Sequence, residues 1–147
     1  MTVKVKVKSK MKQKTDKAMD MYEEKASIHL NNVANMFKNY ASKAMRASTG
    51  GRTYVVTKDG ETHTASIKGN PPAKNTGNLI NSLYVEQATP KRLVASLITE
   101  QKYAGFLEDE QGLDRPFMSK RSAPYKETKK YAEGKYKDIS IGSMKIT

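Results

Sequence analysis

The chain has 147 residues, no cysteine and a net charge of +12 from 27 basic and 15 acidic side chains. This length fits one domain, residues 1–147, with a modest core. The lack of cysteine excludes disulfide frameworks, cysteine zinc sites and thiol catalysis. The positive excess favours contact with polyanions or acidic protein surfaces. No apolar run approaches the roughly 20 residues that cross a bilayer, so we expect a soluble, cytoplasmic protein.

The N-terminal segment alternates between apolar residues and lysine. Period two places successive side chains on opposite faces of a strand. We therefore expect residues 2–12 to form an edge strand or a strand shared between subunits, with Val3, Val5 and Val7 on its buried face. Its other face would point toward DNA or toward neighbouring proteins, and a basic tail that grips nucleic acid remains the alternative. The lysines concerned are Lys4, Lys6, Lys8, Lys10, Lys12 and Lys14.

A long helix is expected over residues 16–47. Apolar residues recur there at steps of three and four and define one apolar face, and Gly50-Gly51 ends the helix. At about 1.5 Å per residue the helix would measure roughly 48 Å, so we expect it to pack across a sheet or along a neighbouring subunit. The apolar face comprises Ala18, Tyr22, Ala26, Leu30, Val33, Phe37, Tyr40, Ala41 and Ala44.

The middle of the chain predicts two hairpins around a short helix. β-rich runs flank an Asp-Gly pair at residues 59–60, which tolerates the positive φ of a tight turn. Thr76 is a good N-cap for a short helix through Leu83. Residues 84–88 and 93–99 then read as a second hairpin.

The C-terminal part predicts a last helix and a weak strand. Ser122 and Pro124 are placed to start the helix, with proline in its first turn. Apolar and polar residues alternate weakly over residues 138–147, which could form a final strand. Together the elements predict an α+β fold, with the long N-terminal helix packed on a mostly antiparallel β-sheet beside a short central helix and a C-terminal helix. The expected segments are a lysine-rich strand or arm (1–14), the long helix (15–48), the sheet with the short helix (49–118), and the C-terminal helix and tail (119–147).

Few side chains indicate chemistry. His29 and His63 lie far apart in sequence without ligand-spaced partners, whereas a metal site needs several convergent ligands. The acids between residues 108 and 114 could form an acid–base pair or a cation site, but they match no calcium loop. We favour a loop whose acids pair with basic residues, within the subunit or across an interface. P-loop and G-x-S-x-G motifs are missing, so we expect no enzyme activity, no catalytic or metal-binding residue and no cofactor.

Three short motifs occur in a particular order: TGNLINSL at residues 76–83, YAGFLE at residues 103–108 and RPFM at residues 115–118. This ordered set resembles the tail-completion, or neck, proteins of tailed bacteriophages, whose members share T-G-x-L-x-x-S, then Y-A-x-x-[L/V]-E, then R-P-F-[L/M]. Such proteins commonly open with a short charged strand and a long helix. The chain departs from the family after Glu108, where Asp-Glu-Gln-Gly replaces a Phe-Gly-Thr turn.

The resemblance implies an α+β fold and a structural virion component without enzymatic activity. It implies a homo-oligomeric ring, six-fold in symmetry, at the head–tail junction of the virion. The ring would connect head-completion or connector proteins to tail terminator or tail tube proteins, around the path of the DNA. It would assemble in the host cytoplasm and touch no membrane.

Physical roles can be assigned to the motif residues. Thr76 would cap the short helix, Gly77 would let the chain turn closely, and Leu79 and Leu83 would anchor the helix in the core. In the YAGFLE motif we expect Tyr103, Phe106 and Leu107 to pack beneath the sheet.

The RPFM motif would stabilise the acidic loop. Arg115 is placed to pair with Glu108 or another acid of the loop, and a bidentate pair would lock it. Pro116 would fix the backbone that enters the last segment, and Phe117 would fill an apolar gap.

A second function class stays open. The net charge of +12 and the lysine-rich start also suit a small basic architectural protein that binds nucleic acid. The chain carries no helix-turn-helix, RNA-recognition or zinc-finger motif to support that class.

Overall fold

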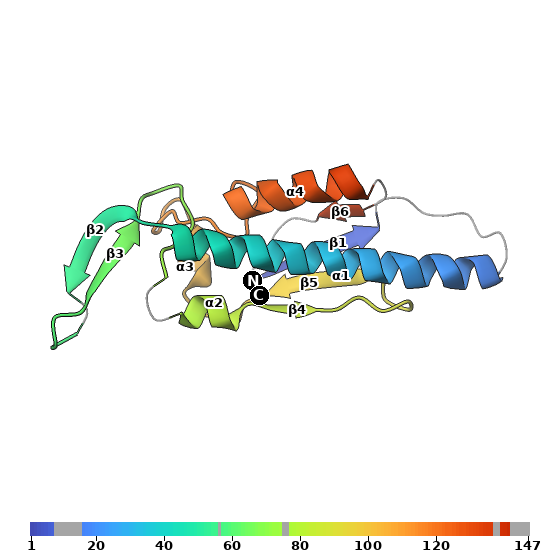
Figure 1. The fold of residues 1–147 in the computed structure, drawn as a ribbon, viewed down its shortest axis with the longest axis horizontal. Coiled ribbons are helices and arrows are strands. Elements are labelled where there is room, and N and C mark those ends of the chain that lie inside the picture. Colours follow the sequence, from blue (N-terminus) through green and yellow to red (C-terminus); the bar gives the residue numbers. More distant parts are fainter. Residues whose placement is uncertain (8–15, 56, 75–76, 137–138, 142–147) are drawn as a thin grey trace.

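A computed structural model describes residues 1–7, 16–55, 57–74, 77–136 and 139–141 of the chain (Figure 1). Its helices and strands, in chain order, are β1 (Thr2–Val7), α1 (Asp16–Ala47), β2 (Gly50–Val55), β3 (Thr62–Ser66), α2 (Asn78–Ser82), β4 (Tyr84–Glu86), β5 (Val94–Ile98), α3 (Ala104–Glu108), α4 (Ala123–Lys135) and β6 (Ile139–Ile141).

The strand β1 lies inside an antiparallel four-stranded sheet of order β4-β5-β1-β6. It pairs with β5 on one side and with β6 on the other, where Val5 lies opposite Ile141. The expected strand is therefore present, but its expected position at an edge is wrong. Both neighbours come from the second half of the chain, so the alternation in β1 carried no information about them. Residues 8–12 of the expected strand lie outside the described residues.

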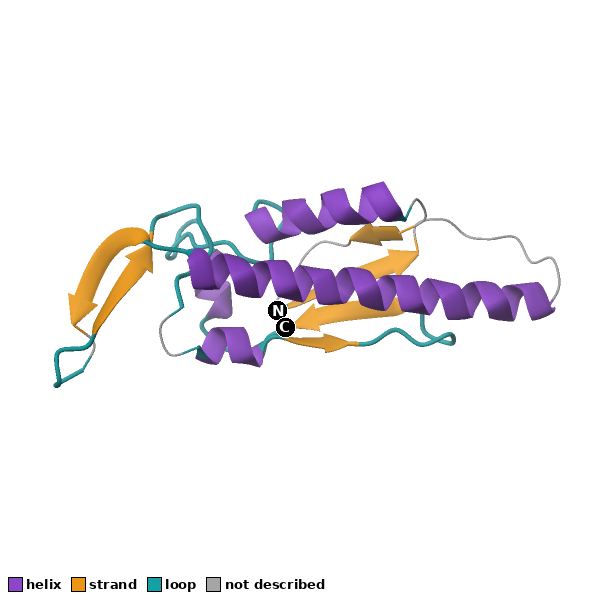
Figure 2. Ribbon diagram, viewed as in Figure 1, coloured by secondary structure: helices purple, strands orange, loops and turns teal. Residues whose placement is uncertain are grey.

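The two faces of this sheet differ sharply in exposure. Val3 and Val5 are 1% and 2% exposed and pack against helices α1 and α4. Lys6, Tyr84 and Glu86 belong to the opposite face and are exposed. Figure 2 shows both long helices over the same side of the sheet. The alternation of valine and lysine thus separates a helix-covered face from a solvent face, as period two requires.

The helix α1 has the bounds predicted from the sequence. Its buried stripe begins only at Ala26 and continues through Leu30, Val33, Phe37 and Ala41; Ala18 is exposed. The polar residue Asn31 also serves the packing, because its amide group donates to the carbonyl oxygen of Ala88 (3.1 Å) and accepts from the Ala88 N–H (2.6 Å). This pair of bonds fastens α1 to the chain just after β4.

The hairpin of β2 and β3 projects from one end of the molecule (Figure 2). Its turn contains Gly60 at φ 84, in agreement with the Asp-Gly prediction. At Gly51 a Cβ atom would lie 2.6 Å from the carbonyl oxygen of Ser66, so only glycine allows the strands to approach there. Tyr54 and Val55 are 47% and 71% exposed. The hairpin therefore presents apolar side chains to solvent.

The remaining predicted elements are also present. The strands β4 and β5 form the second hairpin, and α4 begins at Ser122, whose hydroxyl accepts from the N–H of Tyr125 (3.3 Å). Thr128 and Ala132 are buried on the inner side of α4. The α+β fold with a long N-terminal helix on an antiparallel sheet is confirmed.

Candidate functional site: the loop anchored by Glu108

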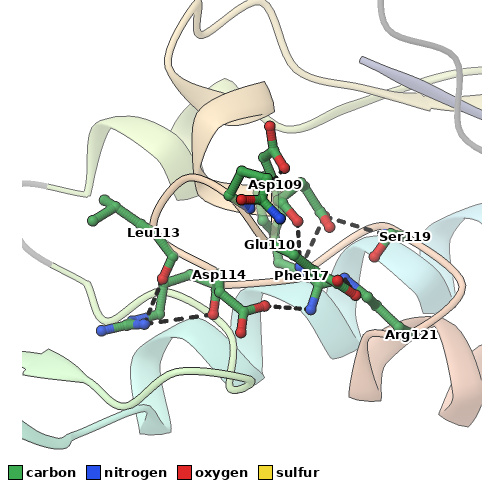
Figure 3. Close-up of polar contacts among 10 residues, drawn as sticks. Asp109, Glu110, Leu113, Asp114, Phe117, Ser119 and Arg121 are labelled. Carbon is green, nitrogen blue, oxygen red and sulfur yellow. Dashed lines mark hydrogen bonds and ion pairs between the residues drawn. The ribbon is translucent and has the colours of Figure 1, made fainter.

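The YAGFLE and RPFM motifs meet in one loop, residues 108–122, which follows α3. Glu108 is only 4% exposed, although it is a carboxylate at a helix end. Its Oε1 accepts from the backbone N–H groups of Phe117 (2.9 Å), Met118 (2.5 Å) and Ser119 (3.1 Å). Figure 3 labels Phe117 and Ser119 among the residues of these contacts. One carboxylate oxygen thus ties the end of α3 to the start of the segment that leads into α4.

This tie places two side chains in the core. Phe117 and Met118 are fully buried, in the same cluster as Ala104 and Tyr125. The expected role of Phe117, which was to fill an apolar gap, is confirmed. Because Glu108 bonds to backbone groups, it fixes the direction in which both side chains leave the loop.

The second oxygen of Glu108 is in a different situation. Oε2 is buried, and within the described part of the chain it has no hydrogen-bond partner. The hydroxyl of Ser119 is likewise buried without a hydrogen-bond partner among the described residues. The contribution of the Glu108 carboxylate to holding the loop therefore comes from Oε1.

The loop closes through Arg121 and not through Arg115. One Arg121 nitrogen bonds to the Asp114 carboxylate and another to the carbonyl oxygen of Glu108, while Nε lies 4.0 Å from Glu110 (Figure 3). Arg115 donates instead to the carbonyl oxygens of Leu113 (2.6 Å) and Asp114 (3.4 Å). The expected Arg115–Glu108 pair is wrong, because the carboxylate of Glu108 turns inward to the backbone while Arg115 stays on the outside of the turn.

A tight turn sets this geometry. Asp109 accepts at Oδ1 from the N–H of Gln111 (2.9 Å), and its carbonyl oxygen accepts from Gly112 (3.0 Å). A Cβ atom on Gly112 would lie 2.3 Å from the carbonyl oxygen of Phe106. Any side chain there would collide with backbone, so glycine is required. The turn brings Asp114 back to the position where Arg121 can reach it.

The outer surface of α3 and the loop is apolar with an acidic border. Tyr103, Phe106 and Leu113 are 44%, 57% and 46% exposed. Asp109 and Glu110 are exposed beside them in the chain. The expectation that Tyr103 and Phe106 pack beneath the sheet is wrong, whereas Leu107 is partly buried against the core. The aromatic residues of this motif thus lie at the surface.

The TGNLINSL motif contributes to the same core. Leu79 and Leu83 of this motif are buried together with Phe117, as expected. Gly77, and not Thr76, occupies the N-cap position of α2, with φ 86 and no side-chain cap bond; Thr76 itself lies outside the described residues. The positive φ accounts for the close turn expected at Gly77.

The N-terminal lysines divide between described and undescribed residues. Lys4 and Lys6 lie on the solvent face of the sheet, and Lys8, Lys10, Lys12 and Lys14 lie outside the described residues. A 2.7 Å hydrogen bond and the charge of Arg92 lower the pKa of Glu86, and the charge of Lys4 contributes. Lys4 therefore interacts electrostatically with Glu86, an acidic residue of the same sheet.

The described residues hold no group of three or more histidine, cysteine, aspartate or glutamate side chains that could bind a metal ion. His29 stacks on Tyr136 with ring centroids 4.4 Å apart, and His63 lies opposite Tyr54 in the hairpin. In the same described part of the chain, no helix has the length and apolarity needed to cross a bilayer. The loop around Glu108 is built to hold a shape, with its charges directed at backbone groups and at Arg121.

Sequence reasoning missed Arg121. One signal was available: Arg121 directly precedes the Ser122 N-cap of α4, so its position relative to the loop is fixed by the helix start. The choice of Arg115 followed proximity in the chain, which does not determine which cation a turn brings to an acid.

No family model, curated protein or solved structure matches this chain. The three motifs and the placement of their residues are therefore the features that bear on function.

Proposed function

We propose that this protein is a non-enzymatic neck, or tail-completion, component of a tailed bacteriophage virion. It forms a ring of six copies at the head–tail junction, between head-completion or connector proteins and the tail terminator or tail tube, around the DNA path. It acts without cofactor, metal or membrane, and is assembled in the host cytoplasm.

One observation carries the proposal. The three motifs that resemble the family, although up to 42 positions apart from residue 76 to residue 118, supply one connected unit. Glu108 of YAGFLE bonds to Phe117 and Met118 of RPFM, and Leu79 and Leu83 of TGNLINSL pack in the same core. A family motif set that forms one structural unit would place its residues in contact in this way, so their convergence supports the resemblance.

The surface supports a role in assembly. Large apolar side chains are exposed on the projecting hairpin and on α3 with its loop, both toward one end of the molecule (Figure 1). Exposed apolar side chains gathered in one region are typical of protein–protein contact sites. The residues are Tyr54, Val55, Ile67, Tyr103, Phe106 and Leu113, whereas the exposed Met21, Ile28 and Tyr84 lie on α1 and β4.

The decisive experiment is electron microscopy of phage particles made without this protein. Separate DNA-filled heads and free tails, rejoined when the protein is supplied, are the expected result. Normal virions would refute the proposal. Native mass spectrometry of the purified chain tests the ring, and Phe106→Asp, which charges the apolar surface without touching the core, should reduce assembly while the matched Ile28→Asp on α1 should not.

The second candidate is a small basic architectural protein that binds nucleic acid. The net charge of +12 favours it. A protein of that class would give normal virions in the particle experiment, and its binding to DNA would weaken steeply with salt.

A further inference from the structure

A polar groove runs between the C-terminal half of α1 and the short helix α2. Its volume is about 560 Å³. No residue of the loop 109–122 and none of the exposed apolar residues of the proposed ring contact lines it, although its α2 wall belongs to the TGNLINSL motif. The lining residues are Lys38, Asn39, Ser42, Lys43 and Arg46 from α1 and Ile80, Asn81 and Leu83 from α2.

The charge in this groove has one sign. After Glu24 the helix α1 carries no acidic residue, and none of the residues lining the groove is acidic. Among the ion pairs of the described residues, Lys38, Lys43 and Arg46 take no part. Three cations therefore share a groove with no ion-pair partner in the described part of the chain, and their mutual repulsion makes an anionic ligand favourable.

Every polar side chain that lines the groove can donate a hydrogen bond. Lysine and arginine only donate, and the amide and hydroxyl groups of Asn39, Asn81 and Ser42 can all donate. The apolar lining residues Ile80 and Leu83 are buried beneath them. Such a surface suits a ligand made of acceptors, whereas protein interfaces usually need exposed apolar or aromatic anchors at their centre.

The spacing suits a run of phosphates. Lys38, Ser42 and Arg46 stand at steps of four on one row of the helix, and Asn39 and Lys43 form the adjacent row. At about 1.5 Å per residue, the cations extend over roughly 12 Å. Double-stranded DNA presents about one negative charge per 1.7 Å of its axis, so a stretch of this length faces several phosphates.

Helix stability alone does not explain these cations. The dipole of a helix favours positive charge only within its last turn, and in α1 that turn contains Arg46 alone. Lys38 and Lys43 lie outside it, so the helix dipole does not account for them.

We propose that this groove binds the sugar–phosphate backbone of double-stranded DNA, without reading its sequence. The site is distinct from the N-terminal lysines and from the loop of Glu108. It gives the protein a nucleic-acid contact that ring assembly does not require.

The test compares two triple variants of equal charge. Lys38→Gln/Lys43→Gln/Arg46→Gln removes the groove cations, and Lys91→Gln/Lys126→Gln/Lys130→Gln removes three exposed lysines elsewhere. Binding to a labelled 30-base-pair random duplex is measured by fluorescence anisotropy from about 50 to 300 mM salt. At about 0.9 per phosphate contact, the groove variant should lower the slope of log K against log salt by about 2.7 and weaken binding about tenfold or more at 0.1 M. The control should change affinity less than about threefold.

Several outcomes would overturn the proposal. These are no binding by the unmodified protein, equal losses in both variants, or competition by polyglutamate as strong as that of duplex DNA at equal charge. Tighter binding to duplex RNA would reject DNA as the ligand. Circular dichroism checks folding, and Lys38→Gln/Lys43→Gln, which keeps Arg46 in the last turn, serves if the triple variant unfolds. Native mass spectrometry separates this idea from the ring: the groove variant should assemble like the unmodified protein, and a loss of assembly would assign the groove to a subunit contact.

Discussion

Replacing Glu108 with alanine tests whether one carboxylate holds the loop together. The change leaves the N–H groups of Phe117, Met118 and Ser119 without their acceptor. Phe117 and Met118 are fully buried, and each buried donor left without a partner costs about 1–3 kcal/mol. We expect Glu108→Ala to lower the free energy of unfolding by about 3–5 kcal/mol. For a chain of this length that corresponds to a fall in Tm of about 10–15 °C.

Glu108→Gln separates the charge from the acceptor. The amide oxygen can still accept from the three N–H groups, but hydrogen bonds to an ionised acceptor are roughly twice as strong. We expect a smaller loss, about 1–2 kcal/mol. Glu110→Ala is the matched control, because the Glu110 side chain is 70% exposed and lies 4.0 Å from Arg121; an exposed pair of this kind contributes about 0–1 kcal/mol.

Thermal and urea unfolding measure the stability of each variant, and amide hydrogen exchange shows which part of the chain is destabilised. In Glu108→Ala, protection should fall at residues 117–119 more than at β1 or β5. The reasoning is refuted if Glu108→Ala melts within about 2 °C of the unmodified protein. It is also refuted if the exchange rates of those three amides do not change.

Other substitutions test neighbouring contacts. Arg121→Ala should lower the free energy of unfolding by about 2 kcal/mol, because it breaks the bonds to Asp114 and to the Glu108 carbonyl. Arg115→Ala should lower it by less than about 1 kcal/mol. If urea unfolding shows the larger loss for Arg115→Ala, Arg121 is not the residue that closes the loop. Phe117→Ala should cost about 3–5 kcal/mol in the same assay, since the ring is fully buried. Arg92→Ala should raise the pKa of Glu86 toward its ordinary value, followed by carboxyl NMR titration. The stability that this pair adds is present at neutral pH and is lost as the pH falls through the lowered pKa of Glu86.

Local patterns predicted the elements well because the signals lie within each element. Period two in β1, the three-and-four spacing in α1, the Asp-Gly turn and the Ser122 cap each depend on a few adjacent residues. The structure follows all four. The apolar pattern of α1 does not predict where burial starts. The pattern begins at Ala18, whereas the first buried residue of the stripe is Ala26.

The errors concern relations between distant segments. The alternation in β1 fixes which side chains share a face, but not that β5 and β6 occupy both sides of the strand. Tyr103 and Phe106 were expected inside because they are aromatic. Apolar residues nevertheless make up much of every protein surface, so burial cannot be inferred from side-chain type alone.

The contacts of the loop of Glu108 indicate which of its residues can be substituted and which cannot. Glu108 bonds to backbone N–H groups, so the residue at position 118 can be leucine or methionine, as the resembling pattern allows, without loss of the bonds. The acceptor itself must reach three donors, so we expect aspartate, which is one methylene shorter, to lose at least one of these bonds. The turn must still bring Asp114 to Arg121, for which Gly112 is needed. The turn at residues 109–112 and the anchor at Glu108 are therefore independent of each other, since the turn's own bonds come from Asp109 and the anchor's come from the segment after it.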